Sequence, residues 1–107
     1  MTIDIHTFPA TFTAIQSILD ERCRQERKWG TQSHPAHIWL AILGEEYGEL
    51  CEASLQYELP HLHNPSGEYD LPAAQLKAAL RKEAVQVAAV AVAMIESIDR
   101  AEDDTDG

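Results

Sequence analysis

The chain has 107 residues, of which 18 are acidic and 8 are basic, so that its formal net charge is −10. Hydrophobic residues make up 45% of the sequence, which is enough for one folded domain with a modest core and excludes a disordered chain. An acidic surface repels phosphate backbones, so no nucleic-acid partner is expected, whereas a nucleotide can still bind together with a divalent cation. We expect a single helical domain over residues 1–101 and an acidic, disordered tail over residues 102–107.

The start of the chain and its cysteines indicate a cytoplasmic location. Residues 1–10 have neither the basic start nor the apolar run of a secretory signal. Cys23 and Cys51 are too few to cross-link a fold of this size, so they are expected to be reduced thiols. The most apolar stretch, residues 84–95, is too short to span a bilayer, which predicts a buried helix and no membrane partner.

The spacing of apolar residues predicts an all-α fold, a bundle of about three main helices. A first helix is predicted over residues 10–28, where apolar side chains recur at three- and four-residue steps. A second is predicted over residues 36–57, with Trp39 in its apolar stripe and therefore in the core. Residues 59–72 contain three prolines and are predicted to form a loop, after which a third helix covers residues 73–100.

The third predicted helix is apolar on two sides. A single chain of this length has too few elements to cover both sides, so we predict a homodimer or homotetramer with this helix in the subunit interface. One side is formed by Leu76, Leu80, Val87, Val90, Met94 and Ile98, and the other by Val85, Ala88, Val92 and Ile95.

Two glutamates fall where a helix normally buries an apolar side chain. On the second predicted helix Glu46 lies inside the apolar stripe, and Glu49 lies at its edge one turn further on. On the third predicted helix Glu83 lies near the centre of one apolar side, and Gln86 takes the edge position. Each helix therefore offers a central carboxylate and an oxygen ligand three residues later, whereas Glu45 points to the polar side.

Buried carboxylates that face one another are unfavourable unless a cation binds between them. Oxygen ligation by several carboxylates suits a hard ion such as Mg²⁺ or Mn²⁺. The alternative is that Glu46 and Glu83 pair with buried arginine or lysine side chains, or lie at a wetter rim of the bundle. Both interpretations stay open on the sequence alone.

Other acidic and metal-binding patterns are weaker. Four histidines and two cysteines could be combined into a zinc site, but the chain has no HExxH and no paired CxxC spacing. A ferritin-like di-iron bundle needs a histidine three residues after its glutamates, which neither Glu46 nor Glu83 has. Glu96 and Asp99 fall on the polar side of the third predicted helix and are predicted to be solvated surface residues.

The spacing of these glutamates resembles the paired acidic signature of the MazG-like all-α NTP pyrophosphohydrolases. The EExxE run that begins at Glu45 and the ExxQ run that begins at Glu83 are similar to the EExxE and ExxD motifs of that family. The stretches ERCRQERKWGTQSH, WLAILGEEYGEL and LRKEAVQVAAVAVAMIESIDR extend the similarity over most of residues 21–100. The chain departs from the family pattern at Gln86, where an aspartate is expected, and in a longer segment between the two motifs.

The resemblance implies hydrolysis of a nucleoside triphosphate, in ribo or deoxy form, to the monophosphate and pyrophosphate by a dimeric or tetrameric enzyme. It implies that Glu46, Glu49 and Glu83 ligate Mg²⁺, with Glu45 as a supporting catalytic residue. Gln86 would then be a neutral and weaker metal ligand. The alternative function is a non-catalytic nucleotide- or metal-binding module for helical oligomerisation.

Several side chains outside the acidic motifs are candidates for substrate binding. Arg24 and Lys28 could steady phosphate groups, although the helix dipole also favours cations near the end of a helix. Trp29 could stack on a nucleobase. Arg81, on the polar side of the third predicted helix, could be solvated or could reach a neighbouring subunit.

Overall fold

A computed structural model describes residue 4 and residues 6–67 and 71–102. All the regular secondary structure in these residues is helical. The three predicted helices are confirmed to within one residue at either end. The prediction of a loop over residues 59–72 was wrong in part, because a short helix interrupts it. The helices are α1 (Pro9–Trp29), α2 (Ala36–Glu58), α3 (Pro60–His63) and α4 (Ala73–Arg100).

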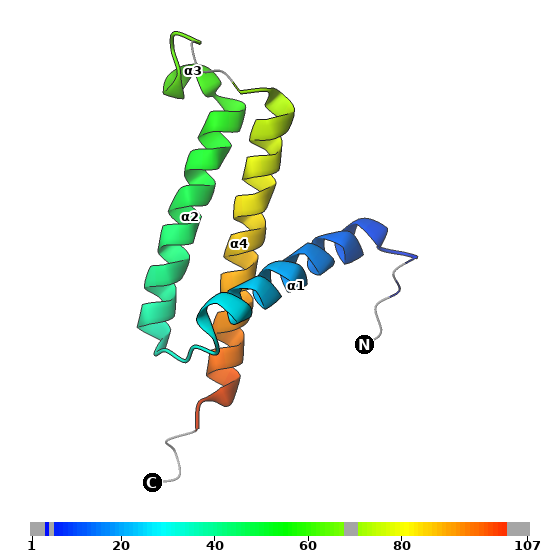
Figure 1. Cartoon of the computed structure of the whole chain (residues 1–107), viewed down its shortest axis with the longest axis vertical. Coiled ribbons are helices and arrows are strands. Elements are labelled where there is room, and N and C mark those ends of the chain that lie inside the picture. Colours follow the sequence, from blue (N-terminus) through cyan, green and yellow to red (C-terminus); the bar gives the residue numbers. More distant parts are fainter. Residues whose placement is uncertain (1–3, 5, 68–70, 103–107) are drawn as a thin grey trace.

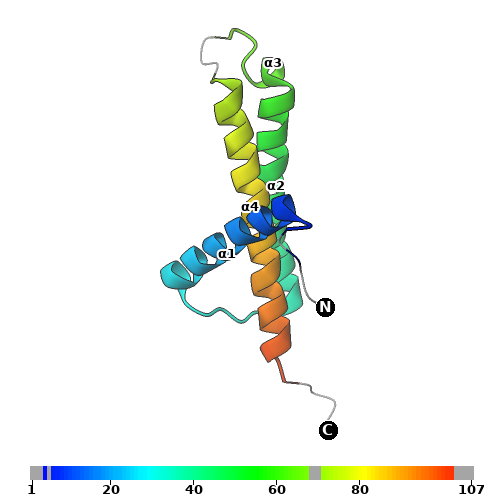
Figure 2. The same cartoon turned by 90° about the vertical axis from the view of Figure 1, so that its right-hand side faces the viewer.

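α4 is the central element of the fold. α2 and α4 run antiparallel and side by side, and α3 lies at the end of the pair where the chain passes from one to the other (Figure 1). α1 crosses α4 obliquely, and its N-terminal part projects away from the helix pair (Figures 1 and 2). Among the described helices, α1 packs against α4 and not against α2. The chain is therefore a helix pair with one crossing helix.

Prolines and one glycine set the helix ends. Pro9 and Pro60 each occupy the first turn of a helix, where the missing N–H of proline costs nothing. Pro60 also ends α2, because its ring cannot continue a helix, and this explains why a new helix begins there. Gly30 follows α1 with φ 71°, a conformation that favours glycine, and its N–H donates to the carbonyl of Glu26 at 2.8 Å.

Trp39 lies at the centre of a small core between α2 and α4. It is 3% exposed and packs with Val90 and Ala93 of α4. The prediction that Trp39 is a core residue is confirmed. Three partly buried side chains surround this group: Ile42, Leu43 and Met94.

The most buried stretch of α4 consists of small side chains. Ala89, Ala93 and Ser97 are 0%, 7% and 4% exposed and recur at four-residue steps. Small side chains let neighbouring helices approach closely, and both α1 and α2 pack on α4. α1 lines a groove with Val85 of the second apolar side of α4, while Ile95 on that side stays 56% exposed.

Hydrogen bonds fasten the connection between α1 and α2 to the end of α4. Ser97 Oγ accepts from the His34 N–H at 3.1 Å and donates to the His34 carbonyl at 3.3 Å. Arg100 Nη2 donates to the carbonyl of Gln32 at 2.7 Å. These bonds set the position at which α2 begins, and with it the place of Trp39 in the core.

Within residues 4, 6–67 and 71–102, no helix has the length and apolar character needed to cross a bilayer. The predicted acidic tail begins at residue 102, which is exposed. The remaining residues of that predicted tail, 103–107, lie outside the described residues.

Candidate metal centre and the cavity beside it

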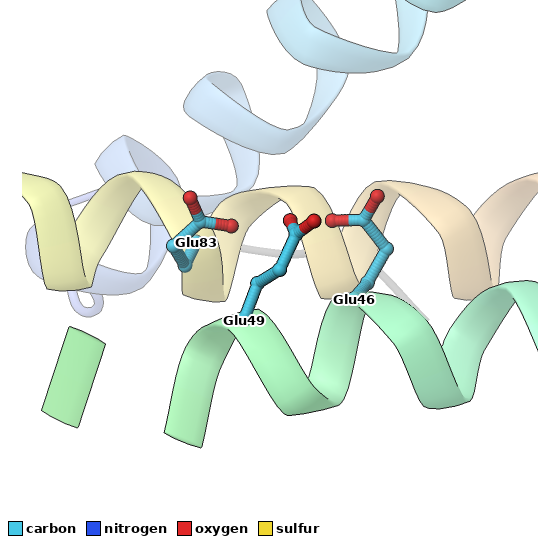
Figure 3. Close-up of side chains that lie close together, drawn as sticks. All are labelled: Glu46, Glu49 and Glu83. Atoms are coloured by element: carbon cyan, nitrogen blue, oxygen red, sulfur yellow. The ribbon is translucent and has the colours of Figure 1, made fainter. Parts of the chain in front are cut away.

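Glu46, Glu49 and Glu83 form a carboxylate cluster between α2 and α4. Each residue offers one carboxylate oxygen, and these oxygens lie within 4.8 Å of one another. Figure 3 shows the carboxylate of Glu49 between those of Glu46 and Glu83. Glu46 and Glu49 stand one turn apart on α2, and the antiparallel pairing brings Glu83 of α4 to the same level.

The cluster has no positive partner in the described part of the chain. Glu46 and Glu83 are half-buried, and the Oε2 atom of each is buried without a hydrogen-bond donor among the described residues. The ion pairs found there join Arg22 and Arg24 to other glutamates. The interpretation of Glu46 and Glu83 as salt-bridged core residues is therefore not supported within these residues. Glu49 is exposed, so the cluster opens to solvent on one side.

Burial raises the pKa of both half-buried carboxyl groups. For Glu46, the negative charges of Glu49 and Glu83 raise the pKa further. For Glu83, burial is again the largest cause of the raised pKa, Glu49 adds to it, and the positive charge of Lys82 opposes it. The ionised forms are thus unfavourable in the metal-free protein, and a proton or a cation would relieve the repulsion.

The donor set fits a hard divalent cation. Mg²⁺ and Mn²⁺ prefer oxygen ligands, and opposite ligands of an octahedral Mg²⁺ site lie roughly 4 Å apart. The oxygens of the carboxylate cluster are within 4.8 Å, so small side-chain rotations bring them to such separations. A cation between them would also give a partner to the buried Oε2 atoms of Glu46 and Glu83.

Two other residues of the predicted site lie beside the carboxylate cluster. Glu45 is exposed, and its charge is the smallest of the causes that raise the pKa of Glu46. Gln86 is half-buried one turn after Glu83 and lines a cavity that Glu46 also lines. The structure thus brings three of the predicted glutamates together, leaves Glu45 at the surface and places Gln86 on the cavity side.

A cavity of about 290 Å³ lies between the three long helices, next to Glu46. Ligand pockets are typically about 300–1,000 Å³, so this volume suits a nucleobase with its sugar and not a whole nucleoside triphosphate. Its wall includes Glu21, Arg22, Arg24, Gln25, Trp29, Trp39, Glu46 and Gln86.

Two of the predicted substrate-binding residues, Arg24 and Trp29, line this cavity, and Lys28 lies over the Trp29 ring. Trp29 is 53% exposed, with Lys28 Nζ 4.7 Å and the Arg24 guanidinium carbon 6.0 Å from the ring centroid. These distances allow cation–π attraction, which keeps positive charge over the indole. Arg24 also pairs with Glu21 at 2.7 Å. The arrangement joins an aromatic surface to two cations in an otherwise acidic protein.

Arg81, the fourth predicted substrate-binding residue, lies apart from this cavity. Its Nη2 donates to Ser17 Oγ of α1 at 2.9 Å, so it contacts α1 of the same chain. Arg81 lines an open groove between α1 and α4 together with Arg24 and Lys82. The sequence did not predict this contact, because it depends on how α1 crosses α4.

The prediction that Glu96 is a solvated surface residue was wrong in part, because its side chain is 39% exposed but forms an ion pair. Arg22 Nη2 donates to Glu96 Oε1 at 2.6 Å and to Glu26 Oε2 at 2.7 Å. α1 crosses α4 on the side that carries Glu96 and so brings Arg22 to it. The four-residue spacing of Arg22 and Glu26 could have signalled the local pair, but nothing local signals a partner 74 positions away. Asp99 is exposed, as predicted.

Comparison of the chain with protein-family models, with curated proteins and with solved structures gives no match.

Proposed function

We propose that this protein hydrolyses a nucleoside triphosphate, in ribo or deoxy form, to the monophosphate and pyrophosphate with Mg²⁺ or Mn²⁺ as cofactor. The observation that carries the proposal is the convergence of three carboxylates from two helices, two of them with a buried oxygen that lacks a donor among the described residues. Such an arrangement is unfavourable unless a cation binds to it. The sequence resemblance to MazG-like pyrophosphohydrolases supports the choice of reaction.

The carboxylate cluster would hold the cation between α2, which carries Glu46 and Glu49, and α4, which carries Glu83. Glu46 and Glu83 provide the half-buried oxygens, and Glu49 provides an oxygen on the solvent side. A bound divalent cation supplies neutralisation of the phosphate oxygens and polarises the bond that breaks. Glu49 is exposed, so substrate and water can reach it from the solvent. Glu45, which is also exposed and directly precedes Glu46, would be a supporting catalytic residue.

In the proposed reaction the oxygen of a water molecule forms a bond to phosphorus. The phosphoanhydride bond between the α- and β-phosphoryl groups breaks, and the leaving group takes the bonding electron pair. A carboxylate of the cluster accepts the proton of the water, and Glu49 is the member with the best access to solvent. The protein therefore contributes mainly by positioning groups and by placing negative charge where the cation must bind.

The cavity beside Glu46 would take the nucleoside part of the substrate. Its volume of about 290 Å³ fits a base and sugar, and Trp29 offers a partly exposed ring for stacking. Arg24 and Lys28 lie over this ring and could hold a phosphate group between the cavity and solvent. Glu46 lines this cavity and also belongs to the carboxylate cluster, so the cavity and the cluster are adjacent.

Exposed apolar side chains on α2 support assembly into a homodimer or homotetramer. Leu40, Tyr47 and Leu55 are 56%, 61% and 44% exposed and share one outward face of α2. Gly44 and Gly48 flank this face with open space beyond them, so a second helix could approach closely. The radius of gyration is 17.5 Å, whereas a compact domain of this length has about 13 Å. A second copy would cover the outward face of α2.

The test is release of pyrophosphate from a panel of ribo- and deoxyribonucleoside triphosphates, with Mg²⁺, with Mn²⁺ and with chelator. We expect metal-dependent formation of equal amounts of monophosphate and pyrophosphate, lost in Glu46→Gln and Glu83→Gln but kept in Glu52→Gln. Glu52 is a matched control because it is an exposed glutamate on the same helix as Glu46. Metal binding without turnover of any substrate would instead support the non-catalytic binding module.

A further inference from the structure

We propose that residues 8–19, the N-terminal half of α1 with its cap, form a docking segment that lies on the outward face of α2 in a second copy of this chain. The outward face of α2 is the side that carries Leu40, Tyr47 and Leu55. The inference rests on the proposed homo-oligomer and names the contact that forms it. It does not depend on the proposed reaction.

The docking segment has an apolar stripe that stays exposed in the single chain. Phe8, Phe12, Ile15 and Leu19 recur at steps of four, three and four residues, so they share one side of the helix. These side chains are 56%, 41%, 38% and 56% exposed. Figures 1 and 2 show this part of α1 projecting away from the helix pair. Because an isolated helix of this length is marginal in water, the segment is expected to gain its stability from a surface that covers the stripe.

The docking segment is also free of charge. The sequence has no Asp, Glu, Lys or Arg between Asp4 and Asp20, although these residues make up 24% of the chain. Two copies that each have a net charge of −10 repel one another, so they are expected to meet where both surfaces are uncharged. The partner surface should therefore be apolar and should lack charged side chains.

The outward face of α2 meets both conditions. Leu40, Tyr47 and Leu55 are 56%, 61% and 44% exposed, and Gly44 and Gly48 leave open space beside them. In the helical repeat, the charged residues within 40–55 all lie on other sides of α2, namely Glu45, Glu46, Glu49 and Glu52. Among the described helices, α1 does not pack against α2 of its own chain. The docking segment can therefore reach this face only in another copy.

The dimensions of the two surfaces agree. At 1.5 Å per residue, residues 8–19 extend over about 17 Å and residues 40–55 over about 22 Å. If two copies exchange their docking segments, the seven exposed side chains of each copy bury roughly 1,300 Å² in total. Stable interfaces bury about 1,200–2,000 Å², and one contact alone would supply half of the lower value. The area therefore favours a two-fold dimer with two reciprocal contacts.

Charged side chains interrupt the other exposed apolar side of the chain. Ile95 and Ile98 of α4 are 56% and 55% exposed. In the helical repeat, Lys77 and Arg81 lie along the same side of α4, and both also line the shallow apolar groove at its N-terminal half. This side is a poorer match for an uncharged segment than the outward face of α2.

Cys51 provides a probe on the outward face of α2, one turn beyond Tyr47. In a Cys23→Ser background, Phe12→Cys or Ile15→Cys should form a disulfide with Cys51 of a second copy when the protein is treated with a mild oxidant. The readout is a covalent dimer on a non-reducing gel, with the linked peptides identified by mass spectrometry. Since α1 and α2 of one chain do not pack together, this linkage must join two copies.

Ala14→Cys in the same background is the matched control, because Ala14 is exposed on the opposite side of α1. It should not link to Cys51. Phe12→Lys should weaken the dimer at least about tenfold, measured by sedimentation over a range of concentrations. Leu62→Lys, which changes a 71% exposed side chain of α3, should not. Circular dichroism checks the fold, and Phe12→Ser replaces Phe12→Lys if the latter does not fold.

A wild-type protein that is monomeric would overturn the inference together with the proposed assembly. A dimer in which neither introduced cysteine links to Cys51, or in which Phe12→Lys binds as tightly as the wild type, would overturn the inference and leave the assembly. Pyrophosphate release is measured separately. Hydrolysis by a protein without this contact would leave the proposed reaction, whereas the cross-links without hydrolysis would keep the inference and remove the reaction.

Discussion

Arg22 of α1 donates through Nη2 to Glu96 of α4 at 2.6 Å, across 74 positions of sequence. The Arg22 side chain is 13% exposed and that of Glu96 is 39% exposed, and Glu26 accepts from the same guanidinium group. Among the described residues this is the ion pair that joins α1 to α4. Because Arg22 also lines the cavity, the pair fixes the wall that α1 contributes to the proposed substrate site.

Glu96→Gln should lower the free energy of unfolding by about 1 kcal/mol, because Arg22 loses one charged partner and keeps Glu26. The measurement is urea unfolding followed by circular dichroism. Mg²⁺ affinity should not change, since Glu96 lies outside the carboxylate cluster. Asp99→Asn, an exposed neighbour on α4, should change neither quantity. Equal stability of Glu96→Gln and wild type would mean that the charge of Glu96 does not help to hold α1 on α4.

Glu83→Gln should stabilise the metal-free protein and weaken binding of Mg²⁺. The substitution removes a carboxyl group whose ionised form is disfavoured by burial and by the negative charge of Glu49. We therefore expect the free energy of unfolding to rise by about 1 kcal/mol. Mg²⁺ affinity should fall at least about tenfold, which calorimetry can measure. Glu52→Gln is the exposed control. Unchanged Mg²⁺ affinity in Glu83→Gln would exclude Glu83 as a ligand.

The stability of the metal-free protein should depend on pH through Glu46 and Glu83. Their folded-state pKa values are raised above the ordinary glutamate value of 4.5, so the unfolded chain releases these protons first as pH rises. Their contribution therefore becomes unfavourable as pH rises from 4.5 through the folded-state pKa values. Glu21 and Glu26 have lowered pKa values, and their favourable contribution is lost only as pH falls below the ordinary value.

The double variant Glu46→Gln/Glu83→Gln isolates this effect. Its advantage in the free energy of unfolding over the wild type should be small below the ordinary glutamate pKa of 4.5 and should grow as pH rises above it. Saturating Mg²⁺ at neutral pH should remove the advantage, because only the wild type binds the ion. An advantage that is the same at every pH would show that side-chain shape, and not charge, is the cause.

Leu40→Lys should reduce the mass of the assembly measured by size-exclusion chromatography with light scattering. Leu40 is 56% exposed on the outward face of α2, and a charge in an apolar interface is unfavourable. Glu52→Lys is the control, because it changes the net charge by more but replaces a residue that is already charged and exposed. A wild-type protein that is monomeric at all concentrations would contradict the proposed assembly.

Periodicity alone predicted the three long helices, the burial of Trp39 and the inward placement of Glu46 and Glu83. These features depend on residues within a few turns of one another, and the 3.6-residue repeat places them on a known face of the helix. The proximity of Glu46, Glu49 and Glu83 can also be predicted from the sequence, if the apolar faces of the second and third predicted helices are assumed to pack against each other. The short helix α3 was missed because a single turn has no apolar period to detect.

The crossing of α1 over α4 was decided only by the tertiary structure. It determines that Arg22 pairs with Glu96, that Arg81 reaches Ser17, and that a cavity with Gln86 in its wall lies beside Glu46. An apolar or polar face can be assigned from sequence, but the helix that covers it and the angle of approach depend on contacts between distant residues. Small side chains at Ala89, Ala93 and Ser97 permit that approach, because helix packing depends on the shape of both surfaces and not on the period of either one.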